Sequence, residues 1–293
     1  MNIKEELVKA RPNLSAGSLK TYESILRNLH KKVFENEEIK KSNFENFSKI
    51  LNYLRDVPAN KRKTILSALV VLTENDEYRN VMTDDVEDYN EEIKKQEKTD
   101  TQRDNWITME EVQQVYEQLE NDAKILFRKS NKTNHDMIEI QNYVIVALLG
   151  GIFIPPRRSL DYCAMKIKNV NRDEDNYISK NKFVFNKYKT AKTYGRQELE
   201  MPQQLKNILN RWISINDGEY LFMDTRGNPL NSVKLNQYMN KIFGGKKISV
   251  NMMRHSYLTD KYTETSINTK KLEKDMESMG SSMSMNQNYI KIK

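Results

Sequence analysis

A tyrosine late in the chain, Tyr289, is a candidate nucleophile because basic side chains occur at several points before it. A phenol ionises near pH ~10 and can attack phosphorus to form a covalent intermediate. Charge developing on the phosphate oxygens would be held by the guanidinium groups of Arg158 and Arg254, which bind phosphate through paired hydrogen bonds. A lysine, Lys189 or Lys192, could protonate the departing 5′-oxygen. The set suits attack by a tyrosine on a phosphodiester.

Each of these residues also has an ordinary explanation when it is considered alone. The chain contains fifteen tyrosines, so Tyr289 by itself is more often a packing residue than a nucleophile. A single arginine at a helix start is most often a surface residue. Motifs of several other enzyme classes are absent from the sequence: the phosphate loop of nucleotide hydrolases, the serine elbow, the HExxH zinc motif and the acidic clusters of two-metal nucleases.

The composition is that of a folded, basic protein. Of its 293 residues, 38% are hydrophobic and 30% charged, with a formal net charge of +7 and an isoelectric point near 9.1. This balance favours a polyanionic partner, nucleic acid first and an acidic membrane surface second. A lysine-rich protein from an A+T-rich genome is the alternative.

The sequence predicts no metal, cofactor or membrane span. One cysteine, Cys163, cannot form an internal disulfide, and three scattered histidines do not make a zinc motif. The first residues lack the apolar core of a secretory signal, and the longest apolar run, 143–149, is too short to cross a bilayer. We therefore expect an intracellular protein.

Residues 1–98 are predicted to form a helical DNA-binding domain. Apolar residues recur at helical spacing, which predicts a bundle of four or five helices, the first clear one capped by Ser15 or Ser18. The basic run 61–63 lies at a predicted helix start, where free backbone N–H groups would add to the attraction for phosphate. Any single lysine here could be solvated surface, but several basic clusters on one small domain favour contact with a duplex backbone.

A second domain is predicted at 108–293, after a linker at 99–107. The stretch 91–105 is polar and has no apolar period, which indicates a connection between domains. Thr108 and Glu111 form a capping box that starts the next helix.

The centre of the second domain is predicted to be a buried helix at 137–149, which is apolar on almost every face. Gly150 and Gly151 end it. The prolines at 155–156 suit the first turn of a following helix, which carries Arg158 and runs to about Met165.

Residues 177–201 predict a β-hairpin. Residues typical of strands occur at 183–185 and again at Leu199, on either side of a lysine-rich tip. Lys189 is expected at the end of the first strand, and Lys192 lies further into the tip. From Asn231 onward the pattern is helical. The predicted fold class is mainly α with a small β-hairpin or sheet.

The order of these motifs resembles the tyrosine recombinase (phage integrase) family over most of the chain. The family's first arginine lies in R-x-x-E, and this chain has Arg158-Ser-Leu-Asp161, with Asp for Glu. The adjacent arginine at 157 fits this spacing less well. The family's second box, H-x-x-R followed by His, is matched by Asn251-Met-Met-Arg254-His255.

The two remaining family elements are also present. Lys189 and Lys192 are each followed by threonine, as in the family's K-T element, and Lys189 fits better. The family's L-G-H box is matched by Met279-Gly280-Ser281, with Tyr289 eight residues later.

The resemblance implies a helical core-binding domain and a catalytic domain that clamp double-stranded DNA, as a homo-oligomer that is a tetramer in the family. Tyr289 would attack the scissile phosphate, leaving a 3′-phosphotyrosyl link and a free 5′-hydroxyl. Arg158 and Arg254 would hold the phosphate, and Lys189 or Lys192 would protonate the leaving oxygen. His255 and Asn251 would support the site, without metal or nucleotide.

Two positions depart from the family pattern and leave alternatives open. Asn251 stands where the family has histidine, and an amide cannot act as an acid or base near neutral pH. Ser281 stands where histidine or tryptophan is expected and is too short to support the tyrosine as a ring would. A type IB-like topoisomerase or resolvase shares the chemistry, and a non-catalytic DNA-binding protein would fit the two substitutions.

Overall fold

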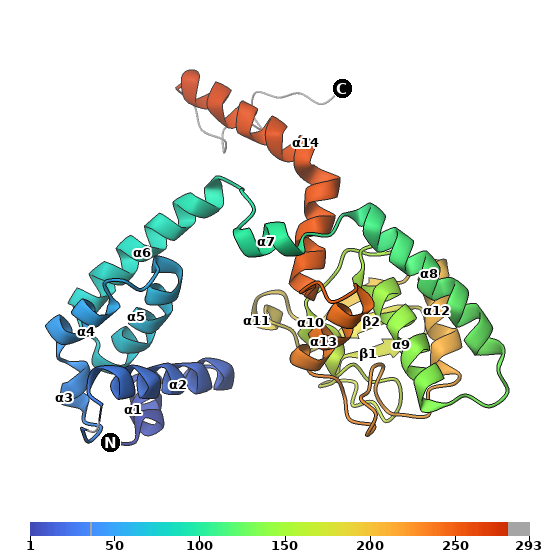
Figure 1. Ribbon diagram of the computed structural model, residues 1–293, viewed down its shortest axis with the longest axis horizontal. Helices are drawn as coiled ribbons and strands as arrows, with labels where there is room; N and C mark the ends of the chain where they lie inside the picture. Colours follow the sequence, from blue (N-terminus) through green and yellow to red (C-terminus); the bar gives the residue numbers. More distant parts are fainter. Residues whose placement is uncertain (36, 281–293) are drawn as a thin grey trace. The chain divides into compact units, whose positions relative to one another are not determined.

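The computed structural model describes residues 1–35 and 37–280, and the chain divides into two compact units, Met1–Lys98 and Thr99–Lys293 (Figure 1). Both units are built mainly of helices, and the second also contains one small antiparallel sheet. This confirms the predicted fold class. In the part of the chain that the structure describes, no helix is both long and apolar enough to span a membrane.

The first unit is a helical bundle. Its described helices are α1 (Ile3–Ala10), α2 (Ala16–Val33), α3 (Lys41–Phe44), α4 (Phe47–Leu54), α5 (Ala59–Thr73) and α6 (Asp76–Lys94). Ser15 caps α2 by accepting a hydrogen bond from the Ser18 amide at 3.0 Å. The prediction of four or five helices was wrong because α1 and the single-turn α3 are too short to show an apolar period.

Helix α5 lies at the centre of this bundle and buries Leu66, Leu69 and Leu72. The buried Tyr78 of α6 donates a hydrogen bond from its hydroxyl to the Phe44 carbonyl at 2.9 Å. Tertiary contact therefore holds α3, which is too short to be stable alone.

The second unit combines helices with a three-stranded sheet. Its described helices are α7 (Asp100–Asn105), α8 (Met109–Arg128), α9 (Asn134–Leu149), α10 (Ser159–Cys163), α11 (Ala191–Tyr194), α12 (Gln203–Ile213), α13 (Ser232–Ile242) and α14 (Val250–Ser278). The strands are β1 (Tyr177–Ser179), β2 (Lys182–Phe185) and β3 (Gln197–Glu200). They pair antiparallel in the order β1-β2-β3. Helix α7 lies within the stretch predicted as linker.

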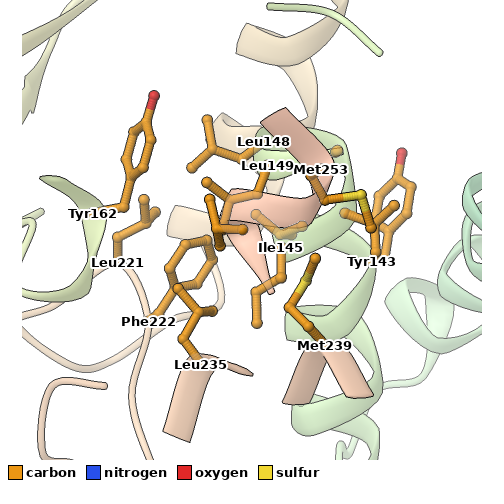
Figure 2. Packing of buried hydrophobic residues seen from close by; sticks show 14 of the residues in the cluster. Tyr143, Ile145, Leu148, Leu149, Tyr162, Leu221, Phe222, Leu235, Met239 and Met253 are labelled. Carbon is orange, nitrogen blue, oxygen red and sulfur yellow. The ribbon is translucent and has the colours of Figure 1, made fainter. Parts of the chain in front are cut away.

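The predicted central helix is confirmed as α9. Every residue from Ile140 to Leu149 is buried. Figure 2 shows Ile145 and Leu149 of α9 among side chains from α10, α13 and α14, including Tyr162, Met239 and Met253. The apolar surface of α9 is therefore the common support of the helices that carry the candidate site.

Two local expectations need correction. Helix α10 is only five residues long and begins after Arg158, so the two prolines lie before the helix rather than in its first turn. The β-type segment forms three strands rather than one hairpin, and its lysine-rich tip contains the short helix α11. The predicted capping box is confirmed: Glu111 accepts from the Thr108 amide at 2.8 Å, and Thr108 accepts in return from the Glu111 amide at 3.1 Å.

Candidate active site on α10 and α14

The turn between α9 and α10 brings Arg158 close to α14. Gly151 has φ +81°, a conformation that glycine adopts without strain. A Cβ atom at this position would lie 2.9 Å from the ring of Tyr257 on α14. The backbone of the turn therefore packs directly on α14, and Arg158 follows as the N-cap of α10.

Asp161 on α10 lies among three arginines. Its side chain is 3% exposed and accepts a hydrogen bond from Arg157 at 2.9 Å. Burial raises the pKa of Asp161, whereas the positive charges of Arg157, Arg158 and Arg254 act in the opposite direction. The charges of Arg158 and Arg254, which are far apart in the sequence, thus both act on one buried carboxylate.

The two adjacent arginines have different surroundings. Arg157 binds Asp161, donates to Gln197 of β3 at 3.0 Å, and lies 4.1 Å from the centroid of the Phe185 ring of β2. Arg158 is half-buried, and its guanidinium makes no hydrogen bond or ion pair with any residue that the structure describes. Arg157 therefore joins α10 to the sheet, whereas the Arg158 donors have no partner among the described residues.

Helix α14 carries the second group of predicted site residues. Arg254 is half-buried and, within residues 1–35 and 37–280, makes no hydrogen bond or ion pair. The exposed Asn251 and His255 lie one helical turn apart, with Nδ2 of the amide 3.2 Å from Nε2 of the ring. The structure brings Asn251 and His255 into direct contact beside Arg254.

The start of α14 and the segment before it are held to the first turn of α8 and the segment before that helix. The buried Ser256 hydroxyl donates to the Ile107 carbonyl at 2.6 Å. Lys246 forms an ion pair with Glu111 at 3.1 Å. These contacts fix the first turns of α14, from which Arg254 extends.

The candidate acid residues lie in the connection between β2 and β3. Strand β2 ends at Phe185, so Lys189 lies four residues beyond the strand, not at its end as predicted, and Lys192 lies in α11. Both lysines are exposed, and neither has a hydrogen bond or ion pair among the described residues. The Tyr188 hydroxyl donates to the Gly195 carbonyl at 2.6 Å, which closes this loop.

Asn176 connects α10 to the segment 186–196, here called the lysine loop, which the sequence did not reveal. It is 7% exposed and forms hydrogen bonds to both α10 and the lysine loop. A lone asparagine after a polar turn has no distinguishing pattern, so no sequence signal could have identified it. Tyr289 and Ser281 lie outside the described residues.

The basic run 61–63 of the first unit is less available for contact with phosphate than predicted. Arg62 donates three hydrogen bonds to the buried Asp85, one of them at 2.9 Å from Nε. The Lys63 ammonium lies 2.9 Å from the centroid of the Tyr89 ring. Lys61 is exposed and makes no ion pair with a described residue. Arg62 and Lys63 are thus engaged in holding α5 to α6.

The path of the chain is similar to that of several solved structures. A lambda integrase dimer bound to a COC′ core site is 15% identical, with a TM-score of 0.47 over 89% of this chain and 88% of that chain. XerA recombinase is 13% identical, with a TM-score of 0.36 over 88% and 82% of the two chains. XerH site-specific recombinase bound to difH substrate is 14% identical, with a TM-score of 0.42 over 89% and 83%. No family model and no curated protein matches the chain.

Proposed function

We propose that the chain is a site-specific DNA recombinase of the tyrosine type, which cleaves and rejoins DNA through a covalent 3′-phosphotyrosyl intermediate. The observation that carries the proposal is that the charges of Arg158 and Arg254 both act on the buried Asp161, while neither guanidinium has a hydrogen bond or ion pair among the described residues. Two guanidinium groups without protein partners suit the charge of one phosphate, which each can bind through paired hydrogen bonds.

The reaction assigns one role to each residue. Arg158 and Arg254 hold the non-bridging oxygens and stabilise the charge that develops in the transition state. Tyr289 attacks phosphorus, and Lys189 or Lys192 protonates the 5′-oxygen that departs. The phosphotyrosyl link conserves the energy of the broken bond, so that a 5′-hydroxyl can later reverse the step. Double-stranded DNA is the proposed partner. It would be bound by a homo-oligomer, which is a tetramer in the family that the sequence resembles.

Asn251 and His255 support this site rather than transfer the main proton. Their mutual contact at 3.2 Å orients both polar groups on the face of α14 beside Arg254. An amide N–H at Asn251 can donate to a phosphate oxygen but cannot exchange a proton near neutral pH.

The test is covalent capture of the protein on DNA. The full chain is incubated with overlapping nicked duplexes that cover the DNA on both sides of its own gene, and protein–DNA adducts that resist SDS are sought. We expect an adduct with the wild-type chain and none with Tyr289→Phe. Tyr262→Phe, which changes an exposed tyrosine of α14, is the matched control and should leave the adduct intact.

Two outcomes would contradict the proposal. An adduct that persists in Tyr289→Phe would show that another residue is the nucleophile. DNA binding that weakens with salt, without any adduct, would instead favour a non-catalytic DNA-binding protein. Contact with the DNA backbone would be recognised by the slope of log K against log salt concentration, which each neutralised phosphate makes steeper by about 0.9.

A further inference from the structure

Every hydrogen-bonding atom of the Asn176 side chain is used. Its Nδ2 donates to the Asp161 carbonyl at 2.9 Å and to the Lys187 carbonyl at 2.7 Å. Its Oδ1 accepts from the Asn186 amide at 2.9 Å and from the Lys187 amide at 2.8 Å. An asparagine side chain has two N–H donors and one carbonyl oxygen with two lone pairs, so none remains.

These four bonds join the two parts of the candidate site. One bond reaches α10 at Asp161, the residue on which the charges of Arg158 and Arg254 both act. The other three hold the backbone at 186–187, directly after β2 ends. Both the amide and the carbonyl of Lys187 are bound, so the direction in which the chain enters the lysine loop is set here.

A second contact limits the loop beyond this point. The Tyr188 hydroxyl donates to the Gly195 carbonyl, so the segment that contains Lys189 and Lys192 is closed at both ends. The guanidinium of Arg157, which precedes α10 and binds Asp161, lies 5.3 Å from the centroid of the Tyr188 ring. The position of either lysine relative to α10 thus depends on the anchor at Asn176.

We propose that Asn176 is a positioning residue for proton donation: it places the lysine loop against α10 so that the lysine ammonium reaches the 5′-oxygen of a phosphate held by Arg158 and Arg254. This inference rests on the proposed function. It assigns Asn176 no contact with the substrate.

The step that Asn176 serves is one proton transfer. The Tyr289 oxygen forms a bond to phosphorus and releases its proton to solvent. The bond between phosphorus and the 5′-oxygen breaks, and its electron pair stays on that oxygen. The 5′-oxygen takes a proton from the lysine ammonium, which becomes a neutral amine.

A substrate with sulfur in place of the bridging 5′-oxygen distinguishes a role in positioning the proton donor from a general effect on protein stability. A thiol ionises with a pKa of about 8.5, so a 5′-thiolate departs without a proton donor. Loss of a general acid slows cleavage of the normal phosphodiester by on the order of 10²-fold or more. The same loss leaves cleavage of the 5′-bridging phosphorothiolate nearly unchanged.

Asn216 provides a matched control for the ordinary structural role of a buried asparagine. It is 1% exposed, donates to the Tyr220 carbonyl at 3.1 Å and accepts from the Gly218 amide at 2.9 Å. None of its bonds reaches α10 or the lysine loop. Asn216→Ala therefore tests what the loss of a buried amide does by itself.

The experiment measures single-turnover adduct formation on matched phosphodiester and phosphorothiolate duplexes, at the cleavage position mapped with the wild-type chain. Asn176→Ala should be slowed by about 10²-fold on the phosphodiester and react at nearly the wild-type rate on the phosphorothiolate. Lys189→Ala, or Lys192→Ala if that lysine is the acid, should show the same pattern. Asn216→Ala should affect both substrates equally.

Equal slowing of Asn176→Ala on both substrates would overturn the positioning role while leaving the proposed function in place. No adduct with the wild-type chain on either substrate would refute the proposed function and the positioning role together. If Asn176→Ala does not fold, Asn176→Asp replaces it. This variant keeps the shape and the two acceptor bonds but loses both donor bonds at neutral pH, and the same dependence on the leaving atom is expected.

Discussion

Replacing each of the two adjacent arginines by methionine should separate stability from activity. Arg157 is bound within the unit, whereas Arg158 has no hydrogen bond or ion pair among the described residues. We expect Arg157→Met to lower the free energy of unfolding strongly. Arg158→Met should lower it much less and abolish most of the proposed cleavage.

The cost of Arg157→Met follows from the carboxylate that it leaves behind. Asp161 is 3% exposed, and removing one partner of a buried ion pair costs about 3–5 kcal/mol. The stacking on Phe185 is also lost.

The size of this cost should depend on pH. Burial already raises the pKa of Asp161, and loss of Arg157 raises it further. A carboxyl with a raised pKa binds its proton more tightly in the folded state than in the unfolded state. Its effect on the free energy of unfolding therefore becomes less favourable as pH rises from the unfolded pKa, about 3.9, through the folded pKa. The penalty of Arg157→Met should be smaller at pH ~4 than at pH ~7.

Arg158→Met removes no hydrogen bond with a described residue, but it removes one of the positive charges that favour the ionised form of Asp161, so the free energy of unfolding should fall by clearly less than for Arg157→Met. If the Arg158 guanidinium binds the phosphate, its loss should reduce the rate of adduct formation by on the order of 10²–10³-fold.

Chemical denaturation followed by tryptophan fluorescence measures the stability directly. The two tryptophans of the chain, Trp106 and Trp212, both lie in the second unit, so the signal reports the unit that contains both arginines. Adduct formation on nicked duplexes measures activity. Equal destabilisation by the two variants would refute the distinction drawn from their contacts, and wild-type adduct formation by Arg158→Met would refute its role at the phosphate.

Two further substitutions test how the second unit is held together. Gly151→Ala should lower the free energy of unfolding by about 1–3 kcal/mol through backbone strain alone. It should cost more than Gly227→Ala. Gly227 has a similar φ of +80°, but an added Cβ there has no atom within 4 Å, whereas a Cβ at Gly151 meets Tyr257. Equal losses of free energy in fluorescence-monitored denaturation would contradict this packing. Asp136→Asn should destabilise the chain at neutral pH, because a hydrogen bond from Lys129 lowers the pKa of Asp136 to about 2. That stability is present above the unfolded pKa and is lost as pH falls toward 2, so the wild-type and variant denaturation curves should converge in acid; a constant gap would show that the charge is not its source.

The local elements of this protein could be predicted from its sequence. The cap at Ser15, the Thr108–Glu111 capping box and the buried helix α9 all depend on residues within a few positions of one another. The short elements α1, α3 and β1 were missed because they span too few residues to show a period. The predicted fold class, mostly helices with one small sheet, followed from the same local patterns.

The sequence by itself determined which residue types are available for phosphate chemistry: Arg158, Arg254 and the lysines of the loop. Only the tertiary structure decided which of two neighbouring arginines lacks a hydrogen bond or ion pair among the described residues, and that Arg62 binds Asp85. It alone showed that Asn176 joins the lysine loop to α10. The physical reason is that a charged or amide side chain is committed by its partner, and these partners come from distant segments. Packing around α9 and the sheet, and not the spacing along the chain, brings them within hydrogen-bonding distance.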